Sequence, residues 1–208
     1  MGVNPHRIEG LVSCEFFSMV EATQFVHETA FGLNRLDWPK ADVILVGPSK
    51  VGKTAIAVSL AQRGLKAVCV NLSPSKPIPE ELKMDTTVKV LMLSMQAEEL
   101  VFRRENHISE LRRKNISYIA DANMADLDVI QQETAYLRNL MAEHPRWLGP
   151  VDCTYTDEAE VSSRIVRLLR QEARGVGEAG AEEAGGAGKF PLLLALVPAL
   201  AAFAAVVP

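Results

Sequence analysis

The sequence predicts an α/β fold in which a mostly parallel sheet carries helices on both faces. Short apolar runs of strand length alternate with longer segments of helical periodicity along the chain. The 208 residues are 48% apolar, which is enough for one well-packed domain and short for two. The octapeptide at residues 47–54 is typical of the turn that joins a strand to a helix in such sheets.

This octapeptide, GPSKVGKT, matches the phosphate-binding loop pattern G-x-x-x-x-G-K-[ST] at every fixed position. It follows the apolar run 43–46, which has the composition of a buried parallel strand. Residues 53–63 then show helical spacing, and Gly64 stands where a helix C-cap would. Strand, glycine-rich turn and helix together predict a P-loop kinase-like fold.

The loop is the predicted site for phosphate and nucleotide. Its glycines let several backbone N–H groups point at one phosphate, and the N-terminal end of the following helix adds to the attraction. We expect Lys53 to reach the transferred phosphoryl group and Thr54 to bind a magnesium ion. The alternative is a structural glycine turn with an exposed lysine. The predicted cofactor-binding residues are Gly47, Pro48, Ser49, Lys50, Val51, Gly52, Lys53 and Thr54.

The segments around the loop continue the same alternation. Ahead of it, residues 11–31 have the pattern of an amphipathic helix. After it, residues 67–72 form a second apolar strand, and three prolines within residues 73–79 enforce an extended loop. A third strand is expected at residues 87–93.

The second half of the chain repeats helix and strand. We expect a charged helix at residues 98–114, a short strand at 116–120 that ends in Asp121, and a long helix at 125–143. A last strand is expected at 151–154. Asp157 and Glu160 then resemble a capping box, which predicts a helix from there to about Arg170.

Composition divides the chain into four parts. They are an N-terminal helical segment at 1–38, interpreted as the remnant of a larger N-terminal region, a P-loop nucleotide-binding domain at 39–174, a Gly/Ala/Glu linker at 175–189 and an apolar tail at 190–208. The tail carries no charge over residues 190–207, which is the lower edge of a membrane-spanning length, but Pro191 and Pro198 interrupt it. A membrane contact is expected through this tail or not at all, and a poorly ordered tail is the alternative.

Charge and side-chain spacing exclude several classes of function. The net charge is −4, and the basic clusters are interleaved with glutamates, so we expect no nucleic-acid partner. Three widely spaced cysteines and four isolated histidines show no zinc-ligand spacing, and reduced thiols are the default. The N-terminus shows neither a secretory signal nor a transit segment.

Longer segments carry a closer resemblance. The order ADVILVGPSKVGKT, SLAQRGLKAVCVNL, PIPEEL, KVLMLSMQAEEL and ADLDVIQQETAYLRNLM resembles the pyruvate, phosphate dikinase regulatory protein family, and EFFSMVEATQFV resembles its segment ahead of the loop. The resemblance runs from about Arg7 to Arg170. It implies a bifunctional enzyme that phosphorylates a dikinase threonine with ADP and removes that phosphate with inorganic phosphate, releasing pyrophosphate. For bacterial members of the family, the resemblance implies phosphoenolpyruvate synthase as the protein substrate.

The resemblance also implies site residues and cofactors. Lys53 would contact the transferred group, with ADP or ATP, Mg²⁺ and inorganic phosphate as ligands. Asp121 and Asp126 compete as catalytic base or second metal ligand: Asp121 ends a strand-like run, and Asp126 matches the family motif. Their structural alternatives are a loop turn for Asp121 and an N-terminal helix carboxylate for Asp126. Arg104 is expected as a phosphate or partner contact, against a solvated helix arginine.

Departures from the family keep two other hypotheses open. Family members carry a further domain ahead of the matching region, and this loop has Lys50 and Val51 where they have arginine and threonine. Lys50 keeps the charge but lacks the bidentate fork of arginine. A catalytically impaired nucleotide-binding relative is therefore the first alternative, and a generic P-loop kinase or ATPase is the second. The expected location is the cytoplasm or the chloroplast stroma, and a homo-oligomer is left open.

Overall fold

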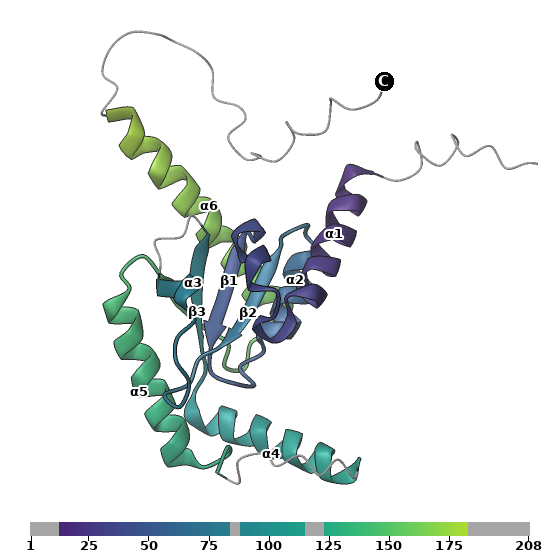
Figure 1. The fold of residues 1–208 in the computed structure, drawn as a ribbon, viewed down its shortest axis with the longest axis vertical. Coiled ribbons are helices and arrows are strands. Elements are labelled where there is room, and N and C mark those ends of the chain that lie inside the picture. The colour runs from purple at the N-terminus through teal and green to yellow at the C-terminus, as the bar shows by residue number, and fades with distance from the viewer. Residues whose placement is uncertain (1–12, 84–87, 115–122, 183–208) are drawn as a thin grey trace, which may run out of the picture. The chain divides into compact units, whose positions relative to one another are not determined.

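A four-stranded sheet, parallel throughout, forms the centre of the molecule. The computed structural model describes residues 13–83, 88–114 and 123–182, and residues up to Gln171 belong to one compact unit. The strands are β1 (Val43–Gly47), β2 (Ala67–Asn71), β3 (Lys89–Ser94) and β4 (Leu148–Asp152), in the order β2-β1-β3-β4 (Figure 1). The predicted parallel sheet is confirmed. Because β2 and β3 flank β1 on opposite sides, the strand order reverses beside the end of β1, where such sheets bind ligands.

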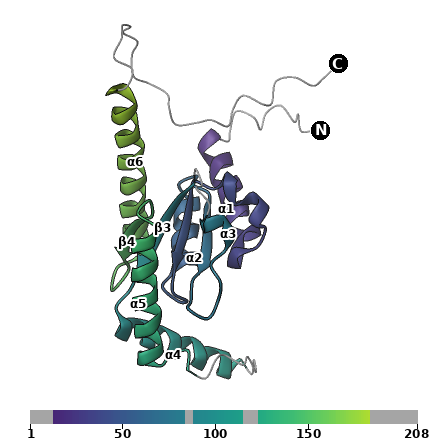
Figure 2. The same cartoon turned by 60° about the vertical axis from the view of Figure 1, so that its left-hand side comes forward.

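Helices cover both faces of this sheet (Figures 1 and 2), as predicted. Leu45 and Leu91 share one core cluster with Ile56 of α2 (Lys53–Ala61) and Ile165 of α6 (Glu158–Glu182). The neighbouring strand positions point the other way, because successive side chains alternate across a strand. There Ile44 and Met92 belong to a second cluster with Trp38 and with Leu137 of α5 (Leu127–Glu143). The site at the sheet edge therefore rests on two separate cores.

The N-terminal helix is shorter than the predicted segment 11–31. Helix α1 (Cys14–Glu28) begins after Ser13, whose side chain accepts a hydrogen bond from the N–H of Phe16. It is followed by the 3₁₀ segments η2 (Ala30–Gly32) and η3 (Arg35–Lys40), because Phe31 takes a left-handed conformation with φ 59° that cannot continue a helix. Residues 11 and 12 lie outside the described residues.

The remaining elements agree in type with the prediction and differ at their ends. Helix α4 (Ala97–Arg113) lies close to the expected range, the short helix α3 (Glu80–Lys83) was not predicted, and β4 runs Leu148–Asp152 where 151–154 was expected. Strand β4 pairs with β3 across an irregularity between Leu91 and Leu93. Helix α6 continues to Glu182, past the expected end at Arg170 and into the segment predicted as a Gly/Ala/Glu linker.

Some predictions fall outside the described residues. These are the strand at 116–120 with Asp121, and the apolar tail at 190–208. Within the described residues, no helix combines the length and apolar character that crossing a membrane requires. The domain boundaries remain predictions.

Candidate functional site

The predicted loop joins the carboxyl end of β1 to the first turn of α2, between β2 and β3. Gly47 ends β1 so close to β3 that a Cβ there would lie 2.7 Å from the carbonyl oxygen of Leu93. Gly52 precedes α2 with φ 105°, a conformation that disfavours other residues. Both pattern glycines are therefore required by the backbone, and the loop has the strand and helix flanks that the sequence predicts.

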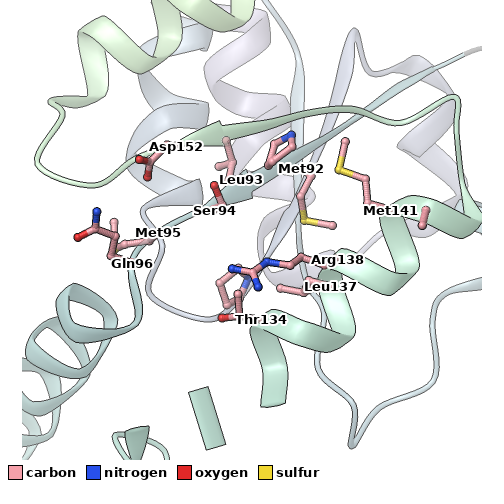
Figure 3. A pocket seen from close by; sticks show the side chains of 13 residues that line it. Met92, Leu93, Ser94, Met95, Gln96, Thr134, Leu137, Arg138, Met141 and Asp152 are labelled. Atoms are coloured by element: carbon pink, nitrogen blue, oxygen red, sulfur yellow. The ribbon is translucent and has the colours of Figure 1, made fainter. Parts of the chain in front are cut away.

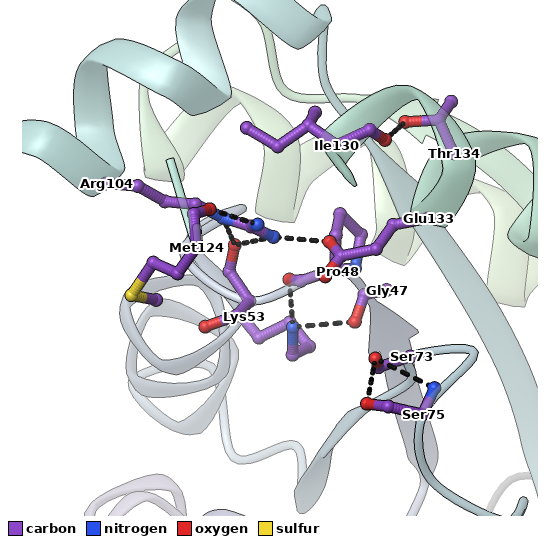
Figure 4. A network of polar contacts seen from close by, with 11 residues as sticks. Gly47, Pro48, Lys53, Ser73, Ser75, Arg104, Met124, Ile130, Glu133 and Thr134 are labelled. Carbon is purple, nitrogen blue, oxygen red and sulfur yellow. Dashed lines mark hydrogen bonds and ion pairs between the residues drawn. The ribbon is translucent and has the colours of Figure 1, made fainter. Parts of the chain in front are cut away.

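Lys53 folds back onto this loop (Figure 4). Its Nζ donates hydrogen bonds to the carbonyl oxygens of Pro48, at 2.6 Å, and Gly47, at 3.1 Å. The side chain is only 6% exposed, and burial lowers the pKa of Lys53 to about 7. The positive charge of Arg104 shifts this pKa in the same direction. Within the described residues, the ammonium donates hydrogen bonds to these two carbonyl oxygens alone, and an anion that approaches it would regain the stabilisation lost on burial.

A cavity of about 310 Å³ opens beside Lys53. Its wall includes Ser49, Lys50, Gly52 and Thr54 of the loop and first helical turn, and Phe31, Ala55, Cys69 and Asn71. Within the described residues, the backbone N–H groups from Ser49 to Gly52 donate no hydrogen bond to the protein. Free N–H groups at a helix N-terminus, together with a lysine, are the donor set that binds phosphate.

The cavity fits a magnesium ion only in part. The Thr54 side chain lines it and is exposed at the start of α2, so its hydroxyl can reach a cation held by a phosphate. No carboxylate lines this cavity in the described part of the chain. The remaining ligands of Mg²⁺ would be phosphate oxygens and water, which this ion commonly keeps.

The loop residues fall into three groups. Ser49, Lys50, Gly52, Lys53 and Thr54 line the cavity, whereas Gly47 and Pro48 supply the carbonyl oxygens that hold Lys53. The side chain of Val51 is fully buried in the core, so only its backbone faces a ligand. Lys50 is half-buried in a left-handed conformation with φ 70°, and burial lowers its pKa.

Arg104 supports the loop from the side of α4 and is not the solvated helix arginine considered above. Its side chain is 1% exposed, and it donates to the carbonyl oxygen of Ser49, to that of Met124 and to the carboxylate of Glu133 (Figure 4). The guanidinium thus ties the loop to the segment before α5 and to α5 itself. Local sequence could not reveal this burial, because the partners come from distant segments.

Of the two candidate aspartates the structure describes Asp126, which does not line the cavity. Asp126 is exposed and is the N-cap of α5, where its Oδ1 accepts a hydrogen bond from the N–H of Asp128 at 2.8 Å. That is the helix-end alternative named above, and a catalytic role for Asp126 stays a prediction. Asp121 lies outside the described residues.

One carboxylate that the sequence reasoning missed lies near the loop. Asp152 ends β4, at the same edge of the sheet where β1 enters the loop. The sequence could have indicated this position, because Asp152 lies in a predicted strand and the carboxyl ends of parallel strands meet at one edge of the sheet. The expected strand at 151–154 placed Asp152 inside the strand, so its terminal position was not recognised.

Comparison with known proteins gives one family. A family model described as kinase/pyrophosphorylase matches residues 3–166. Three similar curated proteins carry the name "putative pyruvate, phosphate dikinase regulatory protein". That of Sorangium cellulosum is 30% identical over 77% of this chain, that of Geotalea daltonii 28% over 80%, and that of Streptococcus agalactiae 28% over 75%. The chain spans 55%, 61% and 54% of their respective lengths.

Proposed function

Because this chain belongs to the kinase/pyrophosphorylase family, we propose that it is a phosphotransferase that regulates pyruvate, phosphate dikinase by reversible phosphorylation of a threonine. In the forward direction ADP is the donor. In the reverse direction inorganic phosphate takes the phosphoryl group and leaves as pyrophosphate. The names of the three relatives support the dikinase as target, and the loop supports a phosphoryl group as the ligand.

The observation that carries this proposal is the state of Lys53. In the described part of the chain the buried ammonium hydrogen-bonds to two carbonyl oxygens and to no anion, and burial lowers its pKa to about 7. A phosphate placed over the free N–H groups of Ser49 to Gly52 would give the ammonium an anionic partner. Charge and positioning, which are what phosphoryl transfer mainly demands of a protein, are therefore available in one place.

Each residue then has a distinct task. Backbone N–H groups of the loop bind and orient the phosphates, and Lys53 neutralises charge on the transferred group. Arg104 holds the loop by donating to the carbonyl oxygen of Ser49, so it does not compete for the N–H groups that would bind the phosphates. A magnesium ion, when bound with help from Thr54, supplies further charge neutralisation. ADP and inorganic phosphate both offer an anionic group to this cradle, which supports one site for both directions.

The test is a transfer assay with a matched lysine control. Purified chain, dikinase, magnesium and ADP are incubated, and phosphate is added in a second stage, while threonine phosphorylation and dikinase activity are followed. We expect Lys53→Ala to abolish both stages and Lys76→Ala, at an exposed lysine outside the cavity lining, to change neither. ADP binding without transfer would instead indicate the impaired relative, and ATP hydrolysis without a protein acceptor the generic kinase.

Partner and location belong to the proposal as well. Phosphoenolpyruvate synthase is the second protein substrate to assay, because the family resemblance includes it. The named relatives are bacterial, which supports the cytoplasm over the chloroplast stroma. A homo-oligomer and a membrane contact through the tail stay predictions.

A further inference from the structure

A second cavity, of about 620 Å³, shares none of its lining residues with the first (Figure 3). Its walls come from the ends of β3 and β4 and from α5, and Pro48 of the loop belongs to its lining. The carbonyl oxygen of the same Pro48 accepts the 2.6 Å hydrogen bond from Lys53. The two cavities therefore flank one loop, the smaller along β2 and the larger along β3 and β4.

The larger cavity combines an apolar floor with charged groups at its rim. Met92, Met95 and Leu137 are buried, and Met141 is half-buried beside them. Arg138 of α5 and Asp152 of β4 lie on opposite sides (Figure 3). Methionine side chains adapt to ligands of varied shape, which suits a polypeptide segment better than a single rigid ring.

We propose that this cavity is the acceptor site, which binds the polypeptide segment that carries the acceptor threonine, with Asp152 as the group that receives the proton of the threonine hydroxyl. The inference rests on the proposed function. In phosphoryl transfer the attacking and leaving oxygens lie roughly in line with the phosphorus. The acceptor must therefore enter on the side of the transferred phosphorus away from AMP, and the larger cavity reaches the loop at Pro48, whose carbonyl oxygen holds Lys53.

Hydrogen bonds hold Asp152 in position. Its Oδ1 accepts from the backbone N–H of Thr154 at 2.9 Å and from the Thr154 hydroxyl at 2.6 Å. The same hydroxyl oxygen accepts from the N–H of Gln96 at 2.9 Å, so the turns after β3 and β4 are linked. Within the described residues, Oδ2 has no protein partner. A carboxylate oriented by one oxygen and open at the other is suited to receive a proton.

Arg138 supplies charge complementarity at the same cavity. It is exposed, and no ion pair or hydrogen bond engages its side chain in the described part of the chain. In the reverse reaction the acceptor segment carries a phosphothreonine, and a guanidinium binds such a group well. Arg138 therefore makes the cavity more favourable for an anionic group of the substrate than the carboxylate of Asp152 alone would.

The forward step balances as follows. The threonine oxygen forms a bond to the β-phosphorus of ADP while its proton passes to Asp152. The bond between that phosphorus and the bridging oxygen breaks, and AMP leaves with the electron pair. In reverse, an oxygen of inorganic phosphate bonds to the phosphothreonine phosphorus, and the threonine oxygen leaves and takes its proton back from Asp152. Pyrophosphate is the second product.

The first experiment separates turnover from binding. For Asp152→Asn we expect kcat to fall about 100-fold or more, with the ADP Kd and the KM for the dikinase unchanged. For Met141→Trp, which fills the cavity, we expect the KM for the dikinase to rise about tenfold with kcat and the ADP Kd unchanged. The matched controls are Glu143→Gln and Asn139→Trp, at exposed positions of α5 outside the lining.

Two kinetic outcomes overturn the proposal. If Asp152→Asn keeps the wild-type kcat, Asp152 does not receive the proton of the threonine. A weaker ADP affinity in Met141→Trp would instead make the cavity a nucleotide site.

A second experiment does not depend on activity. Met141→p-benzoylphenylalanine in the otherwise intact chain should form a photochemical crosslink to the dikinase, whereas the same substitution at Asn139 should not. Absence of the Met141 crosslink overturns the proposal even where transfer is observed. If the Met141 crosslink also forms in the Lys53→Ala background and the wild-type chain shows no transfer, the two proposals separate. The docking site would then stand, and the proposed phosphotransferase activity would be rejected.

Discussion

Arg104 of α4 and Glu133 of α5 form a buried ion pair, with Nη2 and Oε2 2.6 Å apart and side chains 1% and 15% exposed. Breaking such a pair from one side leaves an uncompensated charge in the interior, which costs about 3 to 5 kcal/mol. We expect Glu133→Leu to lower the free energy of unfolding by about that amount, measured by urea denaturation.

A double variant separates the net contribution of the ion pair from the cost of leaving one of its charges buried without a partner. Arg104→Met with Glu133→Leu replaces both charges by apolar groups of similar size, so we expect it to recover most of the lost stability. The same double variant loses the hydrogen bonds from Arg104 to the Ser49 carbonyl, so its ADP affinity should be lower than that of the wild-type chain. A double variant less stable than Glu133→Leu alone and than Arg104→Met alone would contradict this account.

The pKa of Lys53 predicts proton uptake on nucleotide binding. Burial lowers it to about 7, so above that pH the ligand-free protein carries a neutral amine, whereas a bound phosphate favours the ammonium. ADP affinity should therefore fall by up to about tenfold per pH unit above pH 7. Calorimetry in buffers of different ionisation enthalpy measures the proton directly. A binding enthalpy independent of the buffer at about pH 8 would contradict the coupling.

The same group makes the ligand-free protein more stable at high pH. The unfolded lysine has a pKa near 10.5 and the folded one about 7, so the unfolded state binds more protons between these values. The free energy of unfolding should rise with pH across that window, and the cost of the buried charge is fully present below it. Denaturation of wild type and Lys53→Met at several pH values tests this, because the variant should lack the slope.

Lys50 predicts a conflict between stability and binding. Its left-handed backbone, φ 70°, costs about 1 to 2 kcal/mol for a residue with a Cβ. Lys50→Gly removes that strain but gains about 0.5 to 1 kcal/mol of unfolded-state entropy, so the net gain in stability should be between about 0 and 1.5 kcal/mol.

Binding should respond in the opposite direction. Loss of the Lys50 charge from the cavity wall should weaken ADP several-fold, and Lys50→Asn, which tolerates this backbone without the charge, should behave alike. Thermal unfolding and ADP titration of both variants check the pair of effects. Unchanged ADP affinity in both would exclude Lys50 from the phosphate site.

Asp126 provides a test of capping against catalysis. As the N-cap of α5 it should tolerate asparagine with little loss of stability, whereas Asp126→Ala should cost about 1 kcal/mol. We expect Asp126→Asn to keep transfer activity, because its carboxylate serves its own helix. A large loss of kcat in a fully stable Asp126→Asn would assign the residue to catalysis instead.

Much of the fold followed from local pattern. The run at 43–46, the glycine loop and the helix from Lys53 lie consecutively in the chain, so their strand, turn and helix preferences act on neighbouring residues. The third strand and the two long helices were likewise found to within a few residues. The end of α1 and the start of β4 each differ from the prediction by three residues, at the left-handed backbone of Phe31 and beside the irregular pairing of β4 with β3.

By itself, the sequence determined where the glycine loop at residues 47–54 lies, because the backbone of a G-x-x-x-x-G-K-T segment needs only its own glycines and its flanking strand and helix to form. Only the tertiary structure decided what surrounds the loop. It buried Arg104 against Glu133, lowered the pKa of Lys53, and brought Arg138 and Asp152 to the rim of one cavity. Burial and proximity of charges depend on residues far apart in the chain, and local periodicity carries no information about them.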